Sequence, residues 1–440
     1  DEALEKNKGR EKMSKKLSVL AVIALSLMLG MSNACAEKAA KSAEEADTYE
    51  LLNLFGEVME RAKTSYVEEV DDKKLIESAI NGMLVSLDPH SSYLDAQSYK
   101  YMNEQTKGKF GGLGIEVTME NGVVKIVSPI DDTPAAKAGL KPGDYITNID
   151  GEQVIGMSLN DAVDKMRGKV GSKVKLTIRR VGEKPFEVTL KREEVKIQSV
   201  KNDIKSGDVA YIRITSFSGD TDKMVEKAIK QAKKELKGNI KGVVLDVRNN
   251  PGGLLDQAVN ISDLFLDKGE IVSTRSRNEE DTVRYTAKEG DITDGLPIVV
   301  MINDGSASAS EILAGALQDH KRAIILGEKS FGKGSVQTVV PLGKYGAMRL
   351  TTARYYTPSG RSIQATGIIP DVEVHPAKVE EYINNYGLSE AEYRNALKNE
   401  ATGEDKKTEN NTKDEDWRKD YQLSRAVDLV KALGIYTQGK

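Results

Sequence analysis

Two short segments hold residues whose types and spacing are suited to nucleophilic chemistry. Residues 303–312 (NDGSASASEI) follow a predicted strand and open a predicted helix, so Ser308 lies where free N–H groups and the helix dipole stabilise negative charge. Residues 327–337 (GEKSFGKGSVQ) also follow a predicted strand and place Lys333 between two glycines. A serine with a nearby base is a common catalytic nucleophile. A Ser- and Ala-rich turn on its own is more typical of a helix cap, and the turn alone leaves that interpretation open.

Lys333 can act as a general base only when its amine is uncharged. At the ordinary lysine pKa of about 10.4, the neutral form costs roughly 4 to 5 kcal/mol at pH 7. Burial can lower the pKa of a lysine by about 3 to 5. A dry pocket would therefore be sufficient, and this chemistry needs no histidine.

A third segment with chemical potential is residues 246–255 (DVRNNPGGLL), predicted as a strand end, a Gly-Gly turn and the start of a helix. Backbone N–H groups of such a turn can face a substrate carbonyl, and each oxyanion donor is typically worth about 3 to 4 kcal/mol. A plain turn between a strand and a helix is the alternative, because the sequence does not show which way an amide points.

The composition excludes several classes of function. A chain of 440 residues is too long for one ordinary core, so two or more domains are expected. A net charge of −4 gives no electrostatic reason to bind nucleic acid. The one cysteine, Cys35, and three widely separated histidines, His90, His320 and His375, form no pattern that would hold a metal. We therefore expect no metal and no other cofactor.

The N-terminal residues 1–36 are predicted to direct export. Two lysines precede an apolar run over 17–31, and small residues follow, which is the layout of a bacterial secretory signal. We expect location in the periplasm or at the outer face of the cytoplasmic membrane. At roughly fifteen residues the run is short for a spanning helix, so an uncleaved membrane anchor is the less favoured alternative. Cys35 is either a lipid-attachment site or a small residue near the cleavage point.

The rest of the chain is predicted to form several segments, which must position the candidate catalytic residues. Residues 47–107 have apolar side chains at helical spacing, which predicts an N-terminal helical segment that packs on the rest of the protein or on a second copy in a homodimer. Residues 194–398 are predicted as an α/β layered core. Residues 399–416 are polar and are predicted as a solvated linker, and 417–440 as a C-terminal helix. Within the core we expect strands over 209–214, 242–247, 298–302 and 323–326, and helices over 224–236 and 310–317.

Residues 108–193 form a small β-rich module with alternating strands and Gly, Pro and Asp turns. Within it, KFGGLGI (109–115) resembles the carboxylate-binding loop of PDZ domains, and 134–151 resembles the strands and turn that follow that loop. The resemblance implies that the loop residues Gly112, Leu113, Gly114 and Ile115 bind a peptide. Glycines permit a tight turn whose N–H groups converge on a terminal carboxylate, beside which an extended tail can add as a strand.

Ser308, Lys333 and Gln337, in the contexts SASASEI and SFGKGSVQ, resemble the carboxyl-terminal processing peptidases, also called tail-specific proteases. The similarity extends from the helical segment, including LDPHSSYL at 87–94, to Asp371. It implies a multidomain α+β and α/β fold, with a PDZ domain inserted before a crotonase- or ClpP-like peptidase core. It also implies Ser308 as nucleophile, Lys333 as general base and Gln337 as the residue that orients the lysine.

Further roles follow from the same resemblance. The oxyanion hole would consist of the Ala309 N–H and one N–H from Gly252 or Gly253. Asp319 matches a third catalytic member assigned in some relatives, and a plain carboxylate at a helix end is the alternative. Arg167 is a candidate for coupling the PDZ domain to the core, or it simply complements a helix dipole.

The resulting expectation is a serine endopeptidase that captures protein substrates by their free, apolar C-terminal tails. Ser308 attacks a backbone carbonyl, an acyl-enzyme forms and water hydrolyses it, without metal or nucleotide. The competing hypothesis is a catalytically inert PDZ adaptor that binds tails while the α/β layer serves as a scaffold.

Overall fold

The computed structural model describes residues 48–130, 132–380 and 416–438. The chain divides into two units, one up to Ser86 and one from Leu87 onward. The predicted leader with Cys35 lies outside the described residues, as does the predicted linker except for its last residue. None of the helices in the described ranges is long and apolar enough to cross a membrane.

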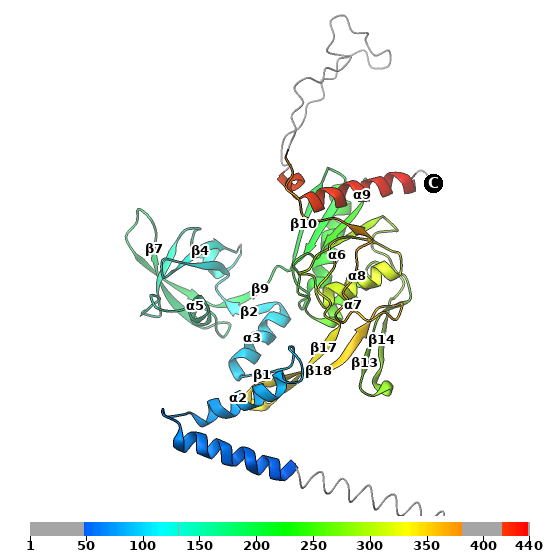
Figure 1. The fold of residues 1–440 in the computed structure, drawn as a ribbon. Helices are drawn as coiled ribbons and strands as arrows, with labels where there is room; N and C mark the ends of the chain where they lie inside the picture. Colours follow the sequence, from blue (N-terminus) through cyan, green and yellow to red (C-terminus); the bar gives the residue numbers. More distant parts are fainter. Residues whose placement is uncertain (1–47, 131, 381–415, 439–440) are drawn as a thin grey trace, which may run out of the picture. The chain divides into compact units, whose positions relative to one another are not determined.

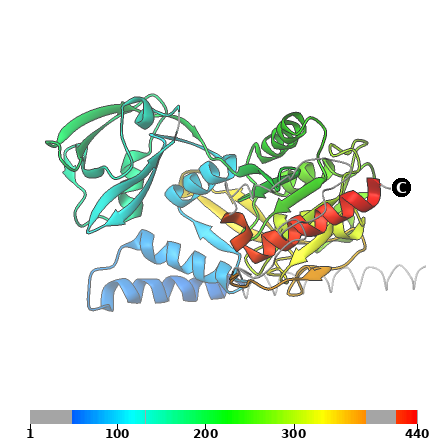
Figure 2. The same cartoon turned by 90° about the horizontal axis from the view of Figure 1, so that it is seen from above.

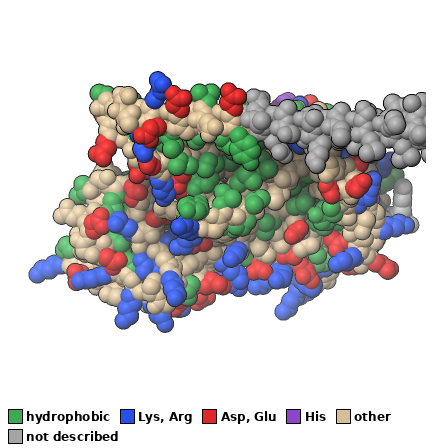
Figure 3. Space-filling view, turned by 90° about the horizontal axis from the view of Figure 1, so that it is seen from below, with side chains coloured by type: hydrophobic (Ala, Val, Ile, Leu, Met, Phe, Trp, Pro, Cys, Tyr) green, Lys and Arg blue, Asp and Glu red, His purple; other side chains and the backbone are tan. Residues whose placement is uncertain are grey.

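The first unit consists of two helices. Residues 48–65 are helical, and α2 (Asp72–Val85) begins at Asp71, whose carboxylate accepts a hydrogen bond from the Lys74 N–H at 2.7 Å. Five apolar side chains of the first helix, predicted to pack on a partner surface, are each 46–58 % exposed: Leu51, Leu52, Leu54, Phe55 and Val58. Hydrophobic side chains are also visible at the surface of the face drawn in Figure 3.

The second unit begins with a short strand that the sequence did not reveal. Inside the segment predicted as helical, β1 (Ser92–Leu94) pairs antiparallel with β18 (Ala347–Tyr356) of the core. Only then does α3 (Ala96–Lys107) follow, ending at Gly108 in the left-handed conformation, with φ 64°. Since β1 has three residues and a partner far along the chain, local periodicity could not detect it.

The β-rich module is built on one antiparallel sheet in the order β3-β4-β5-β7-β8. Strand β7 shows how its core forms: Val174, Leu176 and Ile178 alternate with polar residues and are buried. Helices α4 (Pro134–Lys137) and α5 (Leu159–Met166) belong to the same module. Its strands are β2 (Lys109–Gly112), β3 (Ile115–Glu120), β4 (Val123–Pro129), β5 (Tyr145–Ile149), β6 (Glu152–Gln153), β7 (Lys173–Arg179), β8 (Phe186–Lys191) and β9 (Glu193–Lys196). Strands β2 and β9 pair with each other where the chain enters and leaves the module.

The core is built on a six-stranded sheet in the order β10-β11-β12-β15-β16-β19, parallel except for β10. The expected strands and helices are confirmed with small shifts at their ends. The strands are β10 (Val200–Lys205), β11 (Val209–Ile214), β12 (Gly242–Asp246), β15 (Ile298–Ile302), β16 (Ile324–Gly327) and β19 (Val372–Glu373). The helices are α6 (Thr221–Glu235), α7 (Leu255–Asp263), α8 (Ala309–Asp319) and α9 (Tyr421–Gln438), and short 3-10 turns cover Glu279–Asp281, Gly343–Tyr345 and Asp416–Lys419.

Both faces of this sheet are covered by helices, which explains its unbroken apolar strands. On β12, Val243 and Leu245 face the large cluster that includes residues of α6, α7 and α8, whereas Val244 faces a smaller cluster with α9. Figures 1 and 2 show α9, in red, running across the strands on its own side of the sheet. This layered arrangement confirms the predicted α/β class of the core.

A second sheet joins the core, in the order β1-β18-β13-β14 with β17 also paired to β18. Its remaining strands are β13 (Glu270–Ser276), β14 (Val283–Thr286) and β17 (Ser335–Pro341). Strand β17 begins two residues after Lys333, and its register with β18 pairs Gln337 with Thr351. The second sheet therefore carries the general-base candidate, while the first sheet carries the serine.

Candidate active site

Ser308 lies in the loop between β15 and α8, directly before the helix. Its backbone has φ 57° and ψ −113°, a region that residues other than glycine rarely adopt. The space this requires is provided by Gly252, because a Cβ at Gly252 would lie 2.8 Å from the Ser308 Cβ. The strained turn places the serine at the N-terminus of α8, where the helix dipole favours a developing negative charge.

The loop before α8 is cross-linked to the Gly-Gly loop after β12. Asn250 is the centre of this arrangement: its carbonyl accepts from the Ala307 N–H at 3.0 Å and from the Ser310 hydroxyl at 2.9 Å. Its amide group donates to the Ile214 carbonyl at 2.8 Å. The two loops that surround Ser308 are therefore held as one unit by a buried asparagine.

The same asparagine bears on the choice between the two oxyanion candidates. The Gly252 N–H donates to the Asn250 side-chain oxygen at 2.9 Å and is already used. Within the described ranges, the Gly253 N–H and the Ala309 N–H have no acceptor. Free amides are what an oxyanion hole requires, so the geometry favours Gly253 as the partner of Ala309.

Lys333 is half-buried, and its environment disfavours the charged amine. Burial lowers the pKa of Lys333, and the nearby positive charge of Arg349 lowers it further, against the opposing effects of Glu311 and Asp88. The net direction is toward a neutral amine, as a lysine base requires. Its Nζ forms no hydrogen bond or ion pair in the part of the chain that the structure describes.

A pocket of about 490 Å³ brings the candidates from both sheets together. It is lined by residues that include Ser308, Ala309, Gly253, Lys333 and Gln337. These residues are not all hydrogen-bonded to one another. The Gln337 side-chain amide donates instead to the hydroxyls of Ser335 and Thr351, at 2.9 and 3.2 Å. Among the described residues no hydrogen bond links Ser308 to Lys333 or Lys333 to Gln337.

Glu311 is a site residue that sequence reasoning missed. Its carboxylate is fully buried and accepts four hydrogen bonds: from the Ser308 N–H (2.8 Å), the Ser330 hydroxyl (2.6 Å), and the N–H groups of Gly332 (2.7 Å) and Lys333 (2.9 Å). One oxygen, Oε2, bonds both the Ser308 and the Lys333 N–H. The spacing SxxE, which places a carboxylate at the third helical position, was a signal that could have found it.

Tyr355, on β18, is a second residue that the sequence did not reveal. Its hydroxyl lies 2.6 Å from the Ser308 Oγ, and its ring is buried with 2 % exposure. It lines the same pocket as the serine and the lysine. No motif pointed to it, since the contact depends on how the second sheet packs against the first.

Asp319, the predicted third member, lies at the opposite end of α8 from Ser308. At 1.5 Å per residue, the helix separates them by roughly 16 Å. The Asp319 carboxylate accepts from the Ser359 N–H at 3.0 Å and pairs with Arg361 at 3.3 Å. These contacts are those of a plain carboxylate at a helix end, which was the alternative interpretation. Asp319 is not among the residues that line the pocket.

The histidines do not enter the pocket either. His90 follows Asp88, whose carboxylate accepts from the His90 N–H at 2.7 Å and from Thr351 at 3.1 Å. His320 bonds the Glu270 carbonyl at 2.7 Å, and His375 lies beside Glu328. Within the described ranges no cluster of His, Cys, Asp and Glu is arranged to hold a metal.

The glycine loop of the β-rich module also leaves amides unused. The carbonyl oxygens of Leu113 and Gly114 accept from Ala135 and Ile130 at 3.0 and 2.8 Å, which fixes the loop from one side. In the described part of the chain the N–H groups of Leu113 and Gly114 have no acceptor. Strand β3, which begins at Ile115, lies at the edge of its sheet, so it has room for an added strand.

Arg167 ends α5 and packs between two aromatic rings. Its guanidinium lies 4.3 Å from the centroid of Phe110 and 5.0 Å from that of Tyr101, and 3.9 Å from Glu104. Its Nε and one terminal nitrogen are buried without a hydrogen-bond partner. The contacts from Tyr101 and Glu104 come from α3, outside the β-rich module, so the arginine does more than complement the dipole of its own helix.

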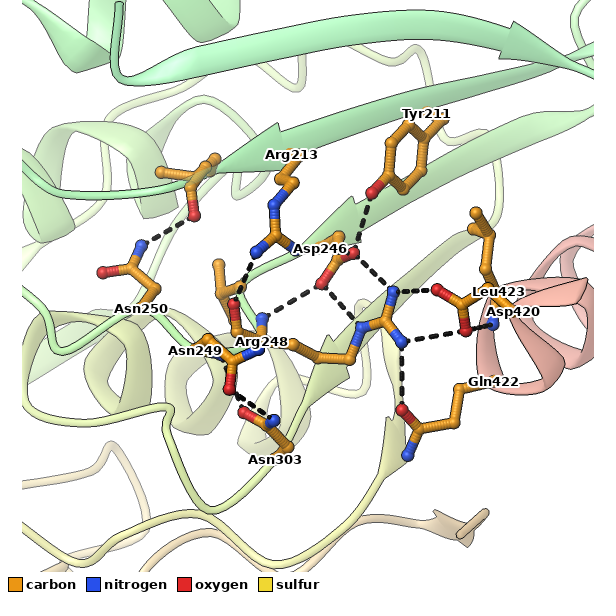
Figure 4. A network of polar contacts seen from close by, with 12 residues as sticks. Tyr211, Arg213, Asp246, Arg248, Asn249, Asn250, Asn303, Asp420, Gln422 and Leu423 are labelled. Carbon is orange, nitrogen blue, oxygen red and sulfur yellow. Dashed lines mark hydrogen bonds and ion pairs between the residues drawn. The ribbon is translucent and has the colours of Figure 1, made fainter. Parts of the chain in front are cut away.

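A polar network anchors the Gly-Gly loop to the C-terminal helix (Figure 4). The buried Asp246 accepts from Tyr211 (2.8 Å), Arg213 (3.0 Å) and Arg248 (2.8 Å). Burial would raise the pKa of Asp246, but the bonded and charged Arg248, with Arg213, outweighs it and holds that pKa below its ordinary value. Arg248 also pairs with Asp420 at 2.7 Å, directly before α9.

Comparisons with known proteins identify the families that the domains resemble. The family model for peptidase family S41 matches residues 208–374, a PDZ domain model matches 125–180, and the model of the activating protease CtpB N-terminal domain matches 22–98. With this fold and site, the chain is a serine peptidase that carries a PDZ domain.

Individual relatives define the family more closely. The chain is 53 % identical over 390 residues to a carboxy-terminal-processing protease of Bartonella bacilliformis, covering 88 % of this chain and 90 % of the relative. It is 39 % identical over 358 residues to the carboxy-terminal processing protease CtpA of Bacillus subtilis, covering 81 % and 75 %. A solved photosystem II D1 C-terminal processing protease is 33 % identical over 72 % of this chain and 86 % of its own, with a TM-score of 0.44. The chain belongs to the carboxy-terminal processing proteases of family S41.

Proposed function

We propose that this chain is an endopeptidase that captures protein substrates by their free, apolar C-terminal tails and cleaves them through a Ser308–Lys333 acyl-enzyme mechanism. The observation that carries the proposal is that Ser308, Lys333, Gly253 and Ala309 line one and the same pocket. It combines a strained serine, a lysine in an environment that favours the neutral amine, and two unused amides.

In the first half of the reaction, the Ser308 Oγ attacks a backbone carbonyl carbon as its proton passes to the Lys333 Nζ. The carbonyl oxygen becomes an oxyanion, which the Gly253 and Ala309 N–H groups stabilise. The C–N bond then breaks, and the Lys333 ammonium gives its proton to the leaving amine. An ester of Ser308 remains, and Lys333 is neutral again.

In the second half, Lys333 takes a proton from a water molecule that attacks the ester carbonyl. The second oxyanion uses the same two amides, the C–Oγ bond breaks, and the Lys333 proton returns to Oγ. A movement must bring Lys333 into hydrogen-bonding contact with Ser308, because no hydrogen bond joins them in the described residues. Gln337, which lines the same pocket, is positioned to receive the ammonium once its side chain leaves Ser335 and Thr351.

Tail recognition is assigned to the PDZ domain, for which we propose the bounds 108–193. The free N–H groups of Leu113 and Gly114 would bind the terminal carboxylate, and the tail would extend β3 by one strand. Arg167, which contacts α3, remains our candidate for coupling tail binding to the core. Unchanged peptide cleavage after Arg167→Ala would reject that coupling.

Export is the part of the proposal that rests on residues 1–36 alone. We propose a cleaved secretory signal and a site of action in the periplasm or at the outer face of the cytoplasmic membrane. Cys35 and the exposed apolar helix 48–65 are candidates for membrane attachment and homodimer contact. An intact N-terminal segment in protein purified from the exporting cell would reject cleavage.

The decisive experiment compares the parent with Ser308→Ala and Lys333→Ala on a peptide that ends in an apolar residue with a free carboxylate. Both variants should lose at least about 10³-fold in kcat while still binding the tail. Amidation of the peptide C-terminus should raise KM in the parent. Equal turnover in all three proteins would reject the site, and tail binding without turnover in the parent would favour the inert adaptor.

A further inference from the structure

The buried phenol of Tyr355 touches the reacting atom of the site but has no place in the two-residue mechanism. Its hydroxyl lies 2.6 Å from the Ser308 Oγ. The ring is 2 % exposed, held within the core cluster that also contains Ala309 and Ile312 of α8. A side chain so enclosed cannot swing away from the serine without repacking the core.

The backbone of Tyr355 is fixed to the other half of the site. Its N–H donates to the Gly334 carbonyl at 3.0 Å, and Gly334 directly follows Lys333. Tyr355 therefore contacts the nucleophile with its side chain and the base segment with its main chain. Glu311 connects the same two segments, but it does so through the backbone N–H groups of Ser308 and Lys333. Of Glu311 and Tyr355, it is the tyrosine whose side chain contacts the Ser308 Oγ.

The direction of the Tyr355–Ser308 hydrogen bond follows from the chemistry at both ends. Burial, aided by the negative charge of Glu311, raises the pKa of Tyr355 against the opposing effect of the Ser308 hydrogen bond. The phenol therefore keeps its proton and is available as a donor. Once the serine proton moves toward Lys333, the Oγ can only accept, and the phenol is the donor at 2.6 Å.

We propose that Tyr355 is a third catalytic residue, which donates a hydrogen bond to the Ser308 Oγ whenever that oxygen carries negative charge. This inference rests on the proposed role of Ser308. During acylation the bond stabilises the Oγ as its proton leaves for Lys333 and the Oγ–C bond forms. During deacylation it stabilises the departing Oγ as the C–Oγ bond breaks, until the Lys333 proton reaches that oxygen. The phenol proton itself stays on Tyr355 throughout, so no extra acid or base is consumed.

The test uses the full chain with Tyr355→Phe, which removes the hydroxyl and keeps the ring in the core. We expect kcat for a tail-bearing peptide to fall about 10- to 100-fold, the range for a hydrogen bond to a charged group, with KM within about two-fold. Labelling of Ser308 by a fluorophosphonate probe should slow by less than kcat, because labelling omits deacylation.

Tyr356→Phe is the matched control, since Tyr356 is the next residue on β18 and its ring stacks on Arg275 at 4.0 Å instead of facing the serine. It should leave kcat unchanged, and thermal melting should show both variants folded. If Tyr355→Phe fails to fold, the same substitution is made in the Ser308→Ala background, which lacks the Tyr355–Ser308 hydrogen bond. Thermal melting then compares the loss of stability caused by Tyr355→Phe with and without the Ser308 hydroxyl. An equal loss in both backgrounds would overturn the proposal.

Two outcomes separate this proposal from the proposed function. Cleavage by folded Tyr355→Phe at the parent rate or faster, while Ser308→Ala is inactive, would overturn the role of Tyr355 and leave the serine assignment intact. Probe labelling that survives in Ser308→Ala would overturn the serine assignment, and the tyrosine proposal with it.

Discussion

Two segments of this protein present unused backbone amides, and the sites that we propose for an anion at each are built in different ways. In the PDZ domain the unused N–H groups belong to the adjacent residues Leu113 and Gly114. At the peptidase site they belong to Gly253, in the Gly-Gly loop, and to Ala309, the first residue of α8, in two segments that Asn250 cross-links. The first receptor is a local turn, whereas the second exists only if two segments fold together. We therefore expect changes in the PDZ loop to alter the affinity for the tail, and changes at the peptidase site to alter the turnover.

Among changes to the two loops and their surroundings, the largest effect should follow from Gly253→Ala. A Cβ at Gly253 would lie 2.1 Å from the Phe217 carbonyl oxygen, so the loop must move and its N–H with it. We expect kcat to fall about 10²- to 10³-fold, the usual cost of one oxyanion donor, with little change in tail binding. Gly238→Ala is the control, because Gly238 also has positive φ but nothing within 4 Å of the added Cβ. A rise in KM at constant kcat would contradict the assignment.

Glu311→Gln tests whether one carboxylate holds the two halves of the site together. An amide NH₂ in place of one oxygen would face backbone N–H donors, so Ser308 and Lys333 would lose a shared acceptor. Steady-state kinetics should show kcat lower by about 10- to 100-fold. Glu328→Gln, at a carboxylate that pairs with the exposed His375, should behave like the parent. An equal kcat in Glu311→Gln and Glu328→Gln would contradict this role. It would show that the Ser308 and Lys333 segments keep their positions without the Glu311 carboxylate.

Gly114→Ala applies the same kind of change to the PDZ loop. Its Cβ would lie 2.3 Å from Thr133, in a backbone conformation with φ +72°. Displaced amides should weaken tail binding and raise KM by about 10-fold, as expected for the loss of one or two charge-assisted hydrogen bonds. Turnover of a saturating peptide should be unchanged. Gly139→Ala, in the same domain with open space around the added Cβ, controls for backbone strain. A fall in kcat alone would contradict the division of labour between the loops.

The smallest effect concerns the pH dependence of kcat. The proposed mechanism needs neutral Lys333, so we expect the rate to rise with pH through the pKa of that amine, which the site holds below its ordinary value. Arg349→Met removes a positive neighbour, so the pKa of Lys333 should rise and the profile should move to higher pH. Asp88, Glu311 and His90 remain in place around the amine and are common to both proteins. A profile that moves to lower pH would contradict the proposed base.

The parts of the fold that sequence reasoning predicted well are those with a local signal. The buried strands of the core are continuous apolar runs, and the strand containing Val243, Val244 and Leu245 is covered on both faces. The segments of Ser308 and Lys333 were each predicted to follow such a strand, and the structure confirms a strand before each of them. The PDZ loop was visible because its receptor lies in consecutive residues.

What the sequence could not provide depends on contacts between distant segments. Strand β1 has three residues and finds its partner at Arg349. Tyr355 meets Ser308 only because the second sheet packs against α8, and the unused Gly253 amide is distinguishable from that of Gly252 only through Asn250. Asp319 was suggested by the resemblance to relatives, but about three turns of helix separate it from the serine.

The C-terminal helix has a consequence for any shortened form of the protein. Helix α9 supplies Leu423, Ala426, Val427 and Val430 to cover the middle strands on one face of the central sheet, and Asp420 secures it to Arg248. A chain that stopped before this helix would present bare aliphatic strands to water and leave a guanidinium without its second carboxylate. Such a fragment should self-associate and precipitate, even though every residue that touches a substrate would still be present.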